Sequence, residues 1–74
     1  MARIDQLDER RIEHPKAHAS VAATYFTFTD EKGERFLQID TYGATDREIP
    51  GKVSQSLQFG PEGLRALREI LDGL

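Results

Sequence analysis

The chain has 74 residues with 13 acidic and 10 basic side chains, a formal net charge of −3, and no cysteine. A single domain of this length buries only about 60% of its unfolded surface, so we expect a homodimer. The absence of cysteine excludes a disulfide framework and a thiolate zinc site, and the mild acidic excess disfavours a strongly basic nucleic-acid binder.

The first segment, residues 1–19, is rich in charge and is predicted to form an N-terminal arm. Ile4, Leu7 and Ile12 favour a short helix over residues 5–13, ended by a His-Pro dipeptide. A frayed or partly docked arm and an arm that packs on a partner subunit both remain open. The segment is too charged for a signal peptide and no apolar run is long enough to cross a membrane, so we expect a cytoplasmic protein.

The next segment, residues 20–29, is rich in β-branched and aromatic side chains and predicts a strand. Its alternation places Phe26 and Phe28 on one face and Tyr25 on the other. The following Asp-Glu-Lys-Gly-Glu sequence predicts a tight hairpin loop, with Gly33 in the left-handed conformation.

A second alternating segment, residues 35–42, predicts the other strand of the hairpin. Leu37 and Ile39 share one face, which we match to the face with the two phenylalanines of the first strand. Phe36 and Tyr42 then lie on the opposite, open face, where aromatic side chains are unusual for a plain solvated surface.

Residues 43–51 form a longer connection, with glycine at its start, a Pro-Gly turn at its end, and room for a short strand near residues 47–49. Residues 52–59 alternate again and predict the last strand. At Gly60-Pro61 the period changes from two to about 3.6, which indicates a helix with Gly60 as its N-cap and Pro61 at its first position. The apolar stripe of this helix consists of Leu64, Leu67, Ile70, Leu71 and Leu74.

These elements predict an α+β fold: an antiparallel β-meander of three to four strands followed by one C-terminal α-helix packed on one face. The domain would span residues 20–74 in the order β-β-(β)-β-α. The helix is expected to cover the apolar side of its own sheet, which we assign to Phe26, Phe28, Leu37, Ile39 and Leu57.

The sequence contains no Gly-rich phosphate loop, no His-Glu-x-x-His pair and no nucleophile elbow. His14 and His18 are four residues apart, but Pro15 between them opposes a shared helical metal site. No nucleophile has an adjacent base, so we expect no enzyme activity, no metal and no cofactor.

One group of residues does indicate a function: a predicted open sheet face that combines aromatic, amide and hydroxyl side chains with a few cations. Its members are Tyr25, Thr27, Arg35, Phe36, Gln38, Tyr42, Lys52, Ser54, Ser56 and Gln58. Single-stranded nucleic acid is bound by this mixture, because aromatic faces stack on bases and cations follow the phosphates. The alternative is that this face packs on a second subunit or on the N-terminal arm.

The order of residues resembles two families. The chain is similar to the single-stranded-DNA-binding domain of the positive-cofactor-four transcriptional coactivators. The similar residues are Tyr25 to Tyr42, then Pro50-Gly51-Lys52, followed by a strand and a helix that begins near Pro61-Glu62. The chain is also similar to a repeat of the PUR family, in the run Gly-Glu-Arg-Phe-Leu-Gln-Ile and the later run Lys-Val-Ser-Gln-Ser-Leu. The two families belong, with the plant Whirly proteins, to one fold group. The resemblance covers about residues 21–72 and implies a dimer with nucleic acid lying across the sheet.

The resemblance also implies individual roles. Lys32 and Lys52 match lysines of the coactivators that contact DNA. Arg35 and Phe36 match the Arg-Phe at the start of the PUR binding strand, and Ser54-Gln55 match the PUR Ser-Gln. Gln38 and Tyr42 complete the expected nucleic-acid-binding set from the open face. The chain departs from both families, because their further cations and stacking residues fall on Glu31, Gln38, Asp40 and Gly43.

The resulting hypothesis is a single-stranded nucleic-acid-binding protein, with DNA favoured over RNA, that uses aromatic stacking and Lys/Arg contacts to phosphate. The alternative is a non-enzymatic protein-interaction or assembly module that keeps the fold but has lost nucleic-acid binding. The missing cations and the acidic balance motivate this alternative.

Overall fold

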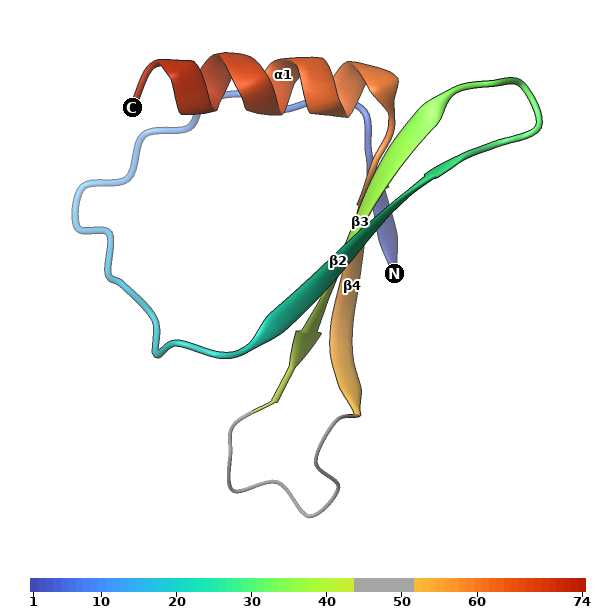
Figure 1. The fold of residues 1–74 in the computed structure, drawn as a ribbon. Coiled ribbons are helices and arrows are strands. Elements are labelled where there is room, and N and C mark those ends of the chain that lie inside the picture. Colours follow the sequence, from blue (N-terminus) through green and yellow to red (C-terminus); the bar gives the residue numbers. More distant parts are fainter. Residues whose placement is uncertain (44–51) are drawn as a thin grey trace.

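The computed structural model describes residues 1–43 and 52–74, and its described part forms one mixed sheet with one helix (Figure 1). The elements are β1 (Ala2–Ile4), β2 (Ala23–Thr29), β3 (Arg35–Tyr42), β4 (Val53–Phe59) and α1 (Pro61–Asp72). The strand order is β1-β4-β3-β2. The fold is therefore α+β as predicted, but only β2, β3 and β4 form an antiparallel meander, because β1 pairs parallel with β4. The predicted short strand at residues 47–49 lies outside the described residues.

The β2–β3 hairpin has the predicted loop. Gly33 adopts a φ of +81°, the left-handed conformation that glycine tolerates best. Asp30 Oδ1 accepts hydrogen bonds from the backbone N–H groups of Lys32 and Glu34, both at 2.9 Å. The Asp30 backbone N–H also donates to the Glu34 carbonyl at 2.9 Å, so the loop is closed by its own local bonds.

The pairing register shows that one assignment of faces was wrong. Phe28 lies opposite Phe36, and Phe26 lies opposite Gln38. Directly opposed residues of an antiparallel pair share a face, so both β2 phenylalanines lie with Phe36 and not with Leu37. The cause is the hairpin: its five-residue loop places Thr29 opposite Arg35, and that pairing sets every other pair.

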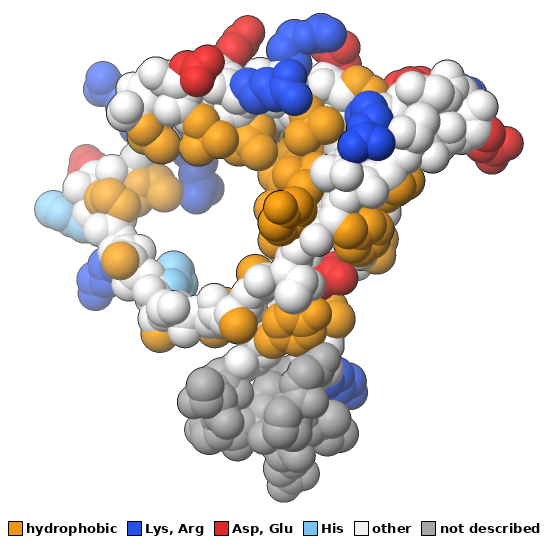
Figure 2. All heavy atoms as spheres, viewed as in Figure 1, with side chains coloured by type: hydrophobic (Ala, Val, Ile, Leu, Met, Phe, Trp, Pro, Cys, Tyr) orange, Lys and Arg blue, Asp and Glu red, His pale blue; other side chains and the backbone are white. Residues whose placement is uncertain are grey.

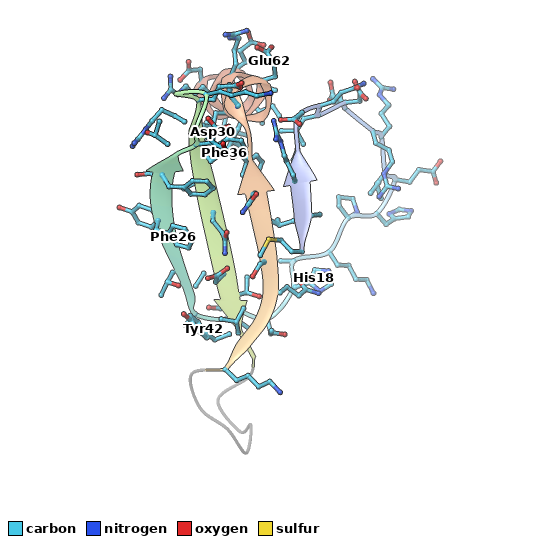
Figure 3. All side chains as sticks on the ribbon, turned by 90° about the vertical axis from the view of Figure 1, so that its right-hand side faces the viewer. His18, Phe26, Asp30, Phe36, Tyr42 and Glu62 are labelled. Carbon is cyan, nitrogen blue, oxygen red and sulfur yellow. The ribbon has the colours of Figure 1, made fainter. Side chains whose placement is uncertain are left out.

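The sheet therefore has two faces of different composition. The helix-side face, toward which α1 lies, carries Ala2, Ile4, Tyr25, Thr27, Arg35, Leu37, Ile39, Leu57 and Phe59. The open face carries Arg3, Thr24, Phe26, Phe28, Phe36, Gln38, Asp40, Tyr42, Ser56 and Gln58. Figure 3 looks directly onto the open face, with Phe26, Phe36 and Tyr42 toward the viewer and α1 behind the top of the sheet.

A register shift between Thr41 and Tyr42 marks an irregularity in the β3–β4 pair, since Gln55 pairs with Thr41 and Val53 pairs with Tyr42. Ser54 has no partner on β3. A β-bulge of this kind adds one residue to one strand and changes the side-chain alternation there.

The helix begins at Pro61 with Gly60 as its N-cap, as the sequence predicts, and Gly60 is in extended conformation. It lies across one end of the sheet and then runs away from it, so only its first turns reach β3 and β4 (Figure 1). Leu64 and Leu67 are half-buried, but the expected burial of the C-terminal part of the stripe is wrong. The exposed members are Ile70, Leu71 and Leu74.

The N-terminal arm differs from its prediction. Residues 2–4 form β1, and residues 5–22 contain no helix, so the helix predicted over residues 5–13 is absent. The edge of β4 explains the strand, because its unpaired backbone groups find partners in β1, and the Gly60 N–H also donates to the Ile4 carbonyl at 3.2 Å. In the described part of the chain, no helix is long and apolar enough to span a membrane.

Candidate functional site

The open face begins with an aromatic cluster that joins β2 to β3. The rings of Phe28 and Phe36 are stacked, with centroids 5.1 Å apart and planes 7° from parallel. The ring of Phe26 is tilted against that of Phe28 at 6.0 Å. Phe36 is only 5% exposed, whereas Phe26 is 46% exposed. Phe26 is therefore the aromatic surface that a ligand can reach, and the expectation that Phe36 is free to touch a ligand was wrong.

Burial of Phe36 involves a residue that sequence analysis did not identify. The guanidinium carbon of Arg3 lies 4.6 Å from the centroid of the Phe36 ring, a cation–π geometry. Arg3 reaches this position because β1 pairs it with Gln58 of β4. Its Nε also lies 2.9 Å from Oδ2 of Asp5. No signal in the sequence marks Arg3, since a three-residue strand has too little alternation to detect.

A chain of side-chain hydrogen bonds crosses the open face beside the aromatic cluster. Gln58 Nε2 donates to Gln38 Oε1 at 2.8 Å, and Gln38 Nε2 donates to Asp40 Oδ1 at 2.9 Å. Ser56 Oγ donates to the same Asp40 oxygen at 2.7 Å. These hydrogen bonds fix the orientations of the Gln58, Gln38, Asp40 and Ser56 side chains, because each side chain is bonded to a neighbour in the chain.

The bonds to Asp40 also fix its charge. The hydroxyl of Ser56, and secondarily the amide of Gln38, hold the pKa of the Asp40 carboxyl below its ordinary value of 3.8. Asp40 is therefore a carboxylate at neutral pH, and its Oδ2 is not used by these two bonds. At the lower end of the face, the hydroxyls of Tyr42 and Thr24 lie 2.9 Å apart and share a hydrogen bond.

The structure brings together three of the residues predicted for the site: Phe36, Gln38 and Tyr42 all lie on the open face (Figure 3). Arg35 does not join them. It lies on the helix-side face, where its guanidinium donates to the hydroxyls of Thr29 and Thr27, both at 3.0 Å.

The remaining predicted residues lie at the margins of the sheet. Lys32 is exposed in the hairpin loop, and Lys52 is exposed immediately before β4. Ser54 is exposed at the irregular start of β4, in a groove with Met1 and Ala2. The cations expected to contact phosphate therefore surround the open face and do not lie at its centre.

The centre of the open face offers the exposed ring of Phe26, the amides of Gln38 and Gln58, and the Ser56 hydroxyl with the Asp40 carboxylate. Such groups can stack on a planar base and exchange hydrogen bonds with its edge, whereas a central carboxylate repels phosphate. Within residues 1–43 and 52–74, no group of three His, Cys, Asp or Glu side chains is arranged to hold a metal ion.

Comparison with known proteins identifies no relative: no protein-family model, no curated protein and no solved structure matches this chain.

Proposed function

We propose that the protein binds single-stranded nucleic acid, with DNA favoured, across the open face. The observation that carries this proposal is the exposed ring of Phe26 beside the hydrogen-bonded chain of Gln58, Gln38 and Asp40. Base stacking on an aromatic side chain contributes about 1–3 kcal/mol and tolerates any base. The resemblance to the coactivator and PUR domains supports the same surface.

The charges on this face favour one orientation of the strand. The bases lie over the centre of the sheet, where the Asp40 carboxylate accepts hydrogen bonds from amino groups of bases. The phosphates run along the margins, past Lys32 in the hairpin loop and Lys52 before β4, and past Arg3, whose guanidinium lies over the Phe36 ring. The ion pair of Arg3 with Asp5 reduces the cation's contribution, so binding is expected to be weak and to fall as salt rises.

The test is fluorescence anisotropy at low salt with labelled oligonucleotides short enough to occupy one face. Phe26→Ala is expected to weaken binding about tenfold, the loss of one stacked base. Tyr25→Ala is the matched control, because Tyr25 is the adjacent exposed aromatic residue on the other face of the same strand, and its loss should change the affinity by less than about twofold.

Two results would overturn the proposal. The first is no binding at protein concentrations up to about 100 μM, the weak end of ordinary non-specific affinity. The second is an equal loss of binding in the Phe26 and Tyr25 variants, since that would place the nucleic acid elsewhere.

A second candidate function is a non-enzymatic protein-interaction or assembly module without nucleic-acid binding. The central negative charge of Asp40 and the marginal position of the lysines favour it. Under this alternative, a pull-down recovers one protein partner, and nuclease treatment does not change its recovery. Loss of the partner after nuclease treatment would contradict this alternative and support nucleic-acid binding.

A further inference from the structure

The described part of the chain has very little core. Its buried apolar side chains are Phe36, 5% exposed, and Phe59, 7% exposed, and no side chain there is fully buried. The radius of gyration is 14.7 Å, whereas a compact domain of this length has a radius of about 11 Å. The single chain is thus much less compact than a typical monomer of this length.

The solvent-exposed area of the single chain is also large for its length. The chain exposes 6648 Å². A compact monomer of this size exposes about 4,600 Å², so roughly 2,000 Å² is in excess. A stable protein–protein contact buries about 800 Å² on each partner, and obligate dimers bury more. The excess is therefore large enough for an obligate interface.

Exposed apolar side chains gather on one side of the molecule (Figure 2). Figure 2 shows a hollow between α1, the sheet and the arm, with apolar side chains along the surface of α1 that faces it. Ile70, Leu71 and Leu74 of α1 are 47%, 55% and 94% exposed, and Leu57 on the helix-side face is 40% exposed. A groove lined by Leu7, Ile70 and Leu74 separates the arm from the end of α1.

We propose that a second copy of this chain fills the hollow, with the apolar stripe of each α1 seated against the helix-side face of the other copy. Each chain carries both the projecting stripe and the hollow, on the same side. A two-fold contact therefore covers both surfaces at once in both copies, and the assembly closes as a dimer.

This arrangement has a consequence for the open faces. The interface uses the helix-side surfaces, so the open face of each copy stays accessible. The dimer thus presents two equivalent open faces, and the interface does not depend on what those faces bind.

The test uses sedimentation and thiol labelling on the full chain. The wild-type chain is expected to sediment as a dimer at about 100 μM and below. Because the chain has no cysteine, a single substitution introduces the only thiol. Ile70→Cys and Phe26→Cys are matched, because these residues are 47% and 46% exposed in the single chain, on the helix-side and open surfaces respectively.

In the dimer, the thiol of the Ile70→Cys chain should react with a maleimide at least tenfold more slowly than that of the Phe26→Cys chain. Leu71→Glu should shift the sedimenting species from dimer toward monomer. If this variant unfolds, the comparison of thiol-labelling rates still tests the proposal. A wild-type monomer at about 100 μM, equal labelling rates, or protection of the Phe26 position instead would each overturn the proposal.

Discussion

At the scale of the residue, three phenylalanines on one face have different environments. Phe36 is sealed by the stacked ring of Phe28 and by the guanidinium of Arg3, whereas Phe26 at the same face keeps nearly half of its surface exposed. Stability and ligand contact are therefore assigned to different rings. Phe36 stabilises the sheet, and Phe26 is available to a ligand.

Replacement of Phe36 by alanine should lower the free energy of unfolding by about 3–5 kcal/mol, because the change opens a cavity between Phe28 and Arg3. Phe26→Ala removes a partly exposed ring and should cost less than about 1.5 kcal/mol. Urea denaturation measures both values. Equal losses in the two variants would contradict the assigned roles.

A second prediction at this scale concerns Asp40 and pH. Its pKa is lower in the folded chain than the ordinary 3.8, because Ser56 and Gln38 donate hydrogen bonds to the charged form. The folded state therefore binds this proton less readily than the unfolded state. The ionised Asp40 carboxyl therefore stabilises the folded state above pH 3.8, and this contribution to the free energy of unfolding is lost as the pH falls through the pKa of the folded state.

Carboxyl NMR titration measures this pKa directly. The midpoint for Asp40 is expected below 3.8, and Ser56→Ala should move it upward by removing the strongest donor. Ser54→Ala is the control on the same strand, because Ser54 makes no hydrogen bond to Asp40. An Asp40 midpoint that does not respond to Ser56→Ala would show that the bond does not hold the charge.

At the scale of the element, the close approach of α1 to β1 depends on a glycine. Gly63 is buried in the first turn of α1, and a Cβ atom there would collide with the backbone carbonyl oxygen of Ile4. The helix can therefore lie against the end of β1 only with a glycine at this position. Gly73, at the other end of α1, has a φ of −88° and ample room for a methyl group.

Gly63→Ala should lower the free energy of unfolding by about 1–3 kcal/mol, because the collision outweighs the gain of about 1 kcal/mol in helix propensity. Gly73→Ala, the control, should leave stability unchanged or raise it by less than about 1 kcal/mol. Thermal denaturation compares the two variants. A Gly63→Ala chain as stable as the wild type would show that α1 does not pack on β1 in this way.

At the scale of the whole molecule, the small core makes stability depend on assembly. If a second copy fills the hollow beneath α1, folding and association are one process, and the dimer gains stability as protein concentration rises. The Tm is therefore expected to rise over a hundredfold range of concentration. A Tm that stays constant over this range would indicate that the single chain is stable by itself, despite its 14.7 Å radius of gyration.

The sequence by itself determined the elements whose signals are local. The hairpin loop with left-handed Gly33, the Gly60 N-cap and the Pro61 helix start are all as predicted, because each depends on the backbone preferences of a few adjacent residues. The alternation within β3 likewise correctly placed Phe36 and Tyr42 on the same face, away from α1.

Tertiary structure decided how the elements meet. The hairpin register moved Phe26 and Phe28 to the open face, and β1 brought Arg3 over Phe36. The direction of α1 left Ile70, Leu71 and Leu74 of its stripe uncovered. Alternation shows that two side chains share a face of one strand, but it does not show which face of the next strand they join. That choice depends on loop length and on contacts between residues far apart in the chain, which no local pattern records.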